Sequence, residues 1–104
     1  MLIIQLRPGT YYYPDSGYGA CGWPIENTDY SVALAPGDYD SGANCGRSIT
    51  VDYSVLGTSV ILTVADECAG CSGDSIDLVS GPMSALDPNY INDGRISVSW
   101  YYND

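Results

Sequence analysis

The sequence contains no histidine, no lysine and no phenylalanine, and only three arginines. Without histidine, a serine or cysteine nucleophile activated by an adjacent histidine is excluded. Thirteen acidic residues against three arginines give a formal net charge of −10, which repels nucleic acid phosphates and anionic lipids. Neutral ligands and cationic surfaces therefore remain as partners. The alternative is that the acidity only keeps a secreted protein in solution.

Long hydrophobic runs are also missing. No stretch approaches the roughly 20 apolar residues of a membrane-spanning helix, so we expect no membrane partner. The opening "MLIIQL" is too short for the apolar region of a signal peptide and has no cleavage site. We expect residues 1–7 to be an N-terminal extension and residues 8–104 to be one domain, which is the size that 104 residues allow.

Ten tyrosines and two tryptophans supply all the aromatic rings. These side chains combine an apolar ring with a polar tip, which suits half-solvated surfaces such as sugar-binding faces. The alternative is that most of them are strand residues of a small barrel.

Four cysteines in a short chain indicate two disulfides and an oxidising, extracellular compartment. Cys68 and Cys71 form a C-x-x-C, but a zinc site needs further ligands, and a thioredoxin-like role needs a βαβ context. The sequence leaves three pairings open, of which we favour Cys21–Cys45 with Cys68–Cys71.

We expect no metal and no cofactor. The stretch "DYDSGAN" resembles part of a calcium loop, with Asp38, Asp40 and Asn44 as oxygen donors. It lacks the late bidentate glutamate and the flanking helices of an EF-hand, so we interpret it as a turn.

Alternation of apolar and polar residues predicts strands, most clearly at 95–100, where Ile96, Val98 and Trp100 share one face. The run 59–66 alternates less cleanly, which predicts that both its faces are covered. One helix is expected over 80–87, with Ser80 as its N-cap and Pro88 ending it. The remaining strands are expected at 9–13, 30–35, 48–53 and 75–79. Six strands with one or two short helices predict an all-β fold, a small barrel.

Four acids crowd the stretch "ADECAGCSGDSIDL" (65–78). Asp66 ends an apolar strand segment and Asp77 lies inside another, where a carboxylate is unfavourable unless it is hydrogen-bonded or functional. Two such carboxylates indicate either glycoside hydrolysis or the binding of a neutral ligand. The alternative for Asp77 is a side chain that accepts hydrogen bonds from loop amides.

The order of motifs resembles a known family. "GTYYYPDSGYGACGW", "VALAPGDYDSGANCGRSITV", "VILTVADECAGCSGDSIDLVSGPMSAL" and "GRISVSWYY" are similar to the double-psi β-barrel of expansins, and most of all to the single-domain fungal loosenins. The resemblance covers about residues 8–102 and implies a six-stranded double-psi β-barrel. It also implies a secreted, monomeric protein.

The resemblance implies roles for individual residues. Thr10 and Tyr12 match the T-x-Y motif that lines the polysaccharide groove of the family. Asp66 matches the groove aspartate before the C-x-x-C, and Asp77 matches the aspartate on which loosening depends and which acts as proton donor in family 45 glycoside hydrolases.

The resemblance also implies that a glycine-rich loop forms part of the site. Asp15, Ala20 and Gly22 lie where this loop meets the groove of the family. Trp23, with Tyr12 and neighbouring tyrosines, is expected to stack on sugar rings.

The sequence departs from the family at several points. Ser75 stands where plant expansins have histidine, and Cys68 where bacterial members have an aromatic residue. We expect no second, sugar-binding domain of the expansin kind, and tyrosine stands where the resemblance places the base of the hydrolases.

Loss of a general base leaves the attacking water unactivated, which costs on the order of 10²–10⁴-fold in rate. We therefore expect a non-hydrolytic protein that binds and loosens a neutral wall polysaccharide (cellulose, chitin or a related glucan). One alternative is a protein-binding barrel such as a cysteine-protease inhibitor or effector. A second is a weak family 45-like hydrolase or lytic transglycosylase.

Overall fold

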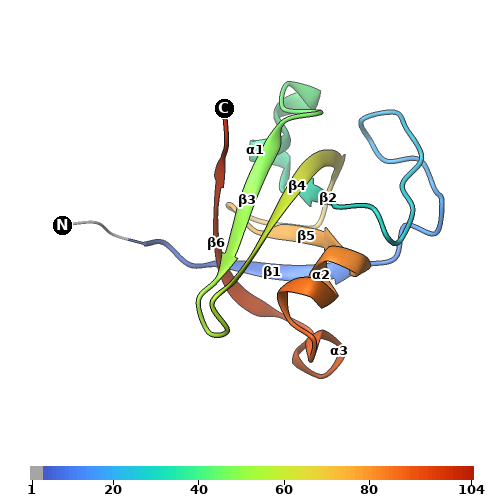
Figure 1. Cartoon of the computed structure of the whole chain (residues 1–104). Coiled ribbons are helices and arrows are strands. Elements are labelled where there is room, and N and C mark those ends of the chain that lie inside the picture. Colours follow the sequence, from blue (N-terminus) through green and yellow to red (C-terminus); the bar gives the residue numbers. More distant parts are fainter. Residues whose placement is uncertain (1–3) are drawn as a thin grey trace.

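Six strands close into a barrel in the computed structural model, which describes residues 4–104 (Figure 1). Around the barrel the strands follow the order β1-β5-β2-β4-β3-β6. The pairs β1–β5 and β2–β4 are parallel and the other pairs are antiparallel. The strands are β1 Arg7–Tyr12, β2 Ser31–Leu34, β3 Ser48–Tyr53, β4 Thr58–Glu67, β5 Ile76–Val79 and β6 Ile96–Tyr102. The predicted six-stranded barrel is confirmed.

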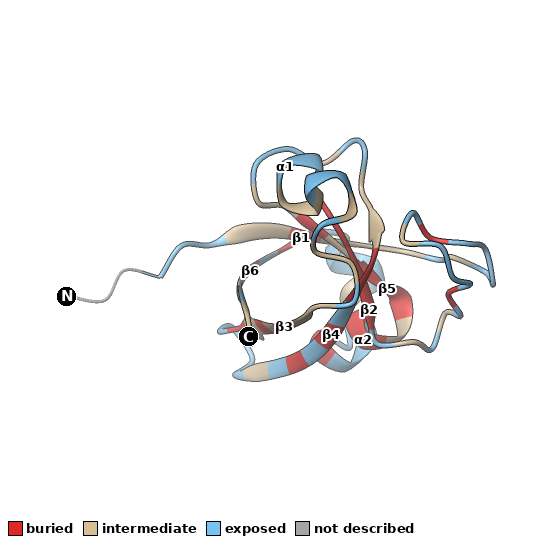
Figure 2. Cartoon of the chain, turned by 90° about the horizontal axis from the view of Figure 1, so that it is seen from above, coloured by how far each residue is buried: buried red, intermediate tan, exposed pale blue. Residues whose placement is uncertain are grey.

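Alternation along the strands fills the barrel interior. On β3, Ile49, Val51 and Tyr53 are buried while their neighbours are half-exposed. Figure 2 shows the same alternation of buried and exposed residues along β4 as bands of red and pale blue. The expectation that both faces of β4 are covered is wrong, because Ile61 on the outer face is 64% exposed. Isoleucine is favoured there by its β-branched shape, which fits a pleated strand even without burial.

The helices are short and lie between strands. They are α1 Pro36–Tyr39, a 3₁₀ turn Asp40–Gly42, α2 Ser80–Leu86 and α3 Tyr90–Asp93. The predicted helix at 80–87 is present, but Ser80 is its first helical residue and Val79 is the N-cap, with no side-chain cap bond. The Ser80 hydroxyl points instead to the Asn27 carbonyl oxygen, 3.5 Å away.

The long connection between β1 and β2, residues 13–30, folds back on itself. A bridge between Tyr18 and Pro24 closes its tip, and the Ile25 side chain is fully buried. Gly19 is required there, because a Cβ at this position would collide with the Ala65 carbonyl oxygen and with Ile25. The loop is therefore packed against β4.

The structure forms the disulfides Cys21–Cys45 and Cys68–Cys71, the pairing favoured above. The first ties the 13–30 loop to the segment before β3, and the second closes a turn between β4 and β5. Within residues 4–104, no group of acids or cysteines is arranged to hold a metal ion. Among the same residues no helix has the length and apolarity needed to cross a membrane.

Candidate functional site

Strand register places two aspartates and a threonine in one row across four neighbouring strands. Thr10 on β1 lies opposite Asp77 on β5, and Asp77 lies opposite Ala33 on β2. Ala33 in turn lies opposite Asp66 on β4. Ile76 and Leu78 are fully buried in the barrel, so Asp77 between them points outward. We call Thr10, Ala33, Asp66 and Asp77 the polar row.

Ala33 was not anticipated from the sequence. It separates the two aspartates, and its methyl group leaves room between them that a larger side chain would fill. The signal available in the sequence was a small residue between two aliphatic ones, Val32 and Leu34, in the predicted strand 30–35.

Direct hydrogen bonds hold the row together. The Thr10 hydroxyl donates to Asp77 Oδ1 at 2.9 Å, and the Tyr12 hydroxyl donates to Asp66 Oδ2 at 3.1 Å. Thr10 and Tyr12 are two residues apart on β1 and therefore share its outer face. The structure thus brings together the four residues that the T-x-Y motif and the two strand aspartates predicted.

Asp66 accepts three hydrogen bonds from other groups of the protein. Besides Tyr12, its Oδ1 accepts the backbone N–H of Ala20 at 2.8 Å and that of Glu67 at 2.9 Å. The Ala20 bond attaches the 13–30 loop to the row. Both oxygens of Asp66 are therefore engaged in orienting protein groups.

Asp77 is in a different electrostatic position. Burial raises the pKa of its carboxyl above the ordinary value, the hydrogen bond from Thr10 lowers it, and the charge of Asp66 raises it again. Burial, and then Asp66, also raise the pKa of the Tyr12 hydroxyl. Among the described residues, the ion pairs are Arg7–Asp74 and Arg47–Asp104, so neither row carboxylate is paired with a cation. Burial therefore makes the neutral form of the Asp77 carboxyl more favourable than it is for an exposed aspartate.

A cavity of about 300 Å³ adjoins the row beside Thr10. The turn closed by Cys68–Cys71 forms one wall, and Arg95 contributes the only cationic side chain of the lining. Ser75 and Cys68, two positions at which the motif differs from the expansin pattern described above, both line this cavity.

The other predicted residues belong to the 13–30 loop. Ala20 reaches the row through its N–H. Asp15 instead pairs with Asn27, donating its N–H to the Asn27 side chain and accepting that amide at 2.8 Å. Gly22 has a φ of +104°, which favours glycine, and Trp23 is 37% exposed. The hydrogen bonds of Asp15, Gly22 and Trp23 lie within the loop, and among residues 4–104 none of them reaches the row.

Comparison with known proteins places this geometry in context. No family model matches the chain. It is 32% identical over 82 residues to a papain inhibitor from Streptomyces mobaraensis, a match that covers 74% of the chain and 57% of that protein. It is also 32% identical over 110 residues to an Arthroderma benhamiae homologue of the allergen Asp f 7, covering 89% of the chain and 37% of the relative. The chain thus spans roughly a third to somewhat over half of the length of these relatives.

Solved structures agree in fold. An asparagine-substituted variant of the Clavibacter michiganensis expansin in complex with cellohexaose superposes with a TM-score of 0.84 at 24% identity, covering 98% of this chain and 51% of that one. The Streptomyces papain inhibitor gives a TM-score of 0.78 at 28% identity and covers 96% and 94%. The chain has the expansin-like double-psi β-barrel fold, and its homologues include a bacterial expansin and a papain inhibitor. The finer resemblance to loosenins stays a prediction.

Proposed function

We propose that this chain is a secreted protein that binds a neutral β-linked glucan along the polar row and loosens its packing without cutting it. The observation that carries the proposal is the Thr10–Asp77 and Tyr12–Asp66 pairing on one outward face of four strands. Support comes from the expansin of the same fold whose structure contains cellohexaose.

In this proposal Asp77 is the group that acts on the glycan. Because burial favours its neutral form, Asp77 can donate a hydrogen bond to a sugar hydroxyl or glycosidic oxygen. Thr10 fixes the orientation of the carboxyl by donating to its Oδ1. A glucan chain held in this way adopts a shape set by the protein, and binding energy shifts chains away from their lateral association.

Hydrolysis needs a second carboxylate to activate water. The nearest candidate, Asp66, already accepts three hydrogen bonds, and Asp15 is occupied by Asn27. Both carboxylates are thus engaged with protein donors, which supports a non-lytic role.

The test is a comparison of wild type with Asp77→Asn on cellulose and on chitin. We expect no soluble fragments by mass spectrometry from either protein, and weakening of cellulose fibres by wild type alone. Asp40→Asn is the matched control, because it removes the same charge from an exposed turn. Fragments that vanish in Asp77→Asn would instead make this chain a hydrolase, and unchanged weakening would remove Asp77 from the site.

A second candidate is inhibition of papain-like proteases. It is favoured by the coverage of the papain inhibitor structure, 94%, against 51% of the expansin. The contact surface would then be the exposed turns at 36–44 and 68–74. Tight inhibition of papain that persists in Asp77→Asn, without any glycan binding, would establish this function and refute the first.

A further inference from the structure

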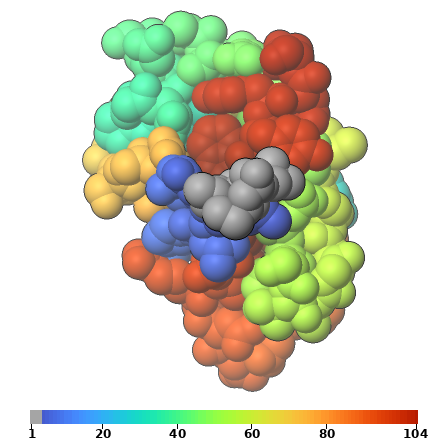
Figure 3. All heavy atoms as spheres, turned by 90° about the vertical axis from the view of Figure 1, so that its left-hand side faces the viewer, coloured from blue at the N-terminus to red at the C-terminus, as the bar shows by residue number. Residues whose placement is uncertain are grey.

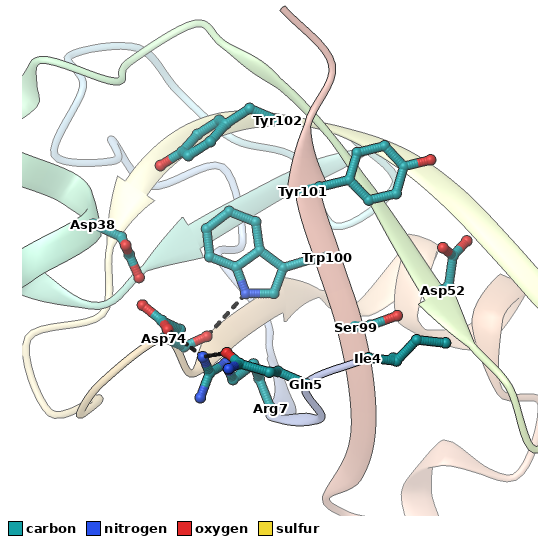
Figure 4. Close-up of a pocket in the computed structure, with 10 residues that line it drawn as sticks. All are labelled: Ile4, Gln5, Arg7, Asp38, Asp52, Asp74, Ser99, Trp100, Tyr101 and Tyr102. Atoms are coloured by element: carbon teal, nitrogen blue, oxygen red, sulfur yellow. Dashed lines mark hydrogen bonds and ion pairs between the residues drawn. The ribbon is translucent and has the colours of Figure 1, made fainter. Parts of the chain in front are cut away.

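We propose that a cavity at the end of the barrel, where β6 passes the start of β1, is a second carbohydrate-binding site that accepts a neutral pyranose unit. The cavity has a volume of about 730 Å³, and Gln5, Arg7, Asp38, Asp74, Trp100 and Tyr102 line it (Figure 4). We refer to it as the end cavity. The choice of ligand class rests in part on the proposed function.

The end cavity is separate from the polar row. No residue lines both this cavity and the one beside Thr10. Figure 3 views the molecule from the side on which the N-terminal segment, the C-terminal strand and the turn between β4 and β5 meet. That turn, residues 68–75, contributes Asp74 to the end cavity and Ser75 to the cavity beside Thr10.

Two aromatic rings form a fixed wall. Trp100 and Tyr102 lie two apart on β6, with ring centroids 5.3 Å apart and planes at 80°. The Trp100 indole N–H donates to the Asp74 carbonyl oxygen at 2.9 Å, and the Arg47 guanidinium lies 3.8 Å over the Tyr102 ring. Because these contacts already fix the Trp100 and Tyr102 rings, binding of a ligand costs little further side-chain entropy.

Polar side chains face these rings. Arg7 pairs with Asp74 at 2.9 Å and also donates to the Gln5 side chain. Asp38 points toward Asp74, and its Oδ2 is shielded from solvent without a donor among residues 4–104. A ligand hydroxyl can supply the missing donor and at the same time accept from Arg7 or Gln5.

The described lining of the end cavity carries one arginine and three aspartates, Asp38, Asp52 and Asp74, which disfavours an anionic sugar. Arg7 already neutralises Asp74, and burial together with Asp74 raises the pKa of Asp38 to about 6, against the opposing effect of Arg7. Below that pH Asp38 is mostly neutral, so Arg7 and Asp74 together with Asp38 then carry little net charge. Flat rings beside mixed donors and acceptors match a pyranose, which presents C–H faces and hydroxyls together.

Two sites on either side of the 68–75 turn would let one chain contact two glucan strands. A protein with a single groove competes for one strand at a time, whereas two sites can separate neighbouring strands. Arg7 and Asp74 would thus extend the polysaccharide contact beyond the polar row.

The two tryptophans allow each region to be followed separately. Trp100 lies in the end cavity and Trp23 in the loop attached to the row, so a ¹⁵N spectrum resolves one indole signal for each. We would titrate wild type and Asp77→Asn with cellohexaose and with chitohexaose, and record intermolecular NOEs from sugar protons to the Trp100 ring. We expect saturable Trp100 shifts and NOEs with at least one sugar in both proteins.

Two mild variants test the polar residues. Loss of a charge-assisted hydrogen bond in Arg7→Gln or Asp38→Ala should weaken the Trp100 response about tenfold, with Asp40→Asn unchanged. Amide spectra confirm that each variant is folded.

The inference is overturned if sugars move the Trp23 signal alone, since the proposed function would then stand without the end cavity. It is equally overturned if a lysine- or arginine-rich peptide, and no sugar, moves Trp100, because the cavity would then bind a basic partner. A Trp100 response that survives in Asp77→Asn while fibre weakening is lost would separate the two sites.

Discussion

Removing the Cys21–Cys45 disulfide should destabilise the protein far more than removing Cys68–Cys71. The first bond joins residues 24 apart in sequence and the second joins residues only 3 apart. In the chain-entropy model the unfolded chain gains freedom with the logarithm of the loop length, which gives about 3.5 kcal/mol for the long loop and about 2 kcal/mol for the short one. The half-buried Cys21 also packs against the core, which adds to the first cost.

The perturbations are the paired serine variants Cys21→Ser with Cys45→Ser, and Cys68→Ser with Cys71→Ser. Urea unfolding followed by far-ultraviolet circular dichroism gives the free energy of unfolding for each. For a domain of this size, a loss of about 3.5 kcal/mol lowers Tm by roughly 15–25 °C. Equal losses for the two pairs would refute the loop-length argument, and a larger loss for the short loop would show that the turn before β5 controls stability.

Three further predictions concern single residues. Asp77→Asn should raise the free energy of unfolding at pH 7, because the folded state binds the Asp77 proton more tightly than the unfolded chain does. This gain should vanish near pH 3, where Asp77 is protonated in both states. Urea midpoints of both proteins at the two pH values test this. Because the pKa of Asp38 is raised to about 6, wild type should lose stability as the pH rises from about 4 through about 6, and Asp38→Asn should reduce this loss. The same dependence of Tm on pH in both proteins would contradict the raised pKa. Gly19→Ala should cost about 1–3 kcal/mol because its methyl group meets the Ala65 carbonyl, whereas Gly70→Ala, which has open space, should be nearly neutral in the same urea assay.

Much of the barrel follows from local patterns. The predicted strand 48–53 coincides with β3 because its buried and half-exposed residues alternate without interruption. Four-residue helices such as α1 and α3 were missed because they are too short for any helical periodicity to appear. Ile61 misled the prediction because an isolated exposed isoleucine looks the same in sequence as a buried one.

Local sequence patterns predict less of the candidate site than of the barrel. Asp77 stands out as a carboxylate inside an apolar strand, but nothing local indicates that Thr10 lies beside it. That pairing depends on the parallel register of β1 and β5, and it entered the sequence analysis through the family resemblance. The end cavity was not predicted at all, since Arg7, Asp74 and Trp100 come from three distant segments.

The position of β5 between β1 and β2 has a consequence for how the protein acquires its activity. Thr10 and Asp77 are 67 residues apart in sequence, so a chain that ends before β5 lacks this pair although it already contains Ala33 and Asp66. Contacts at such separation form slowly, because a long loop must close before any stabilising contact is made. The Thr10–Asp77 pair therefore forms only after β5 has inserted between β1 and β2. Under the proposed function, binding to polysaccharide would select molecules in which β5 is already in place.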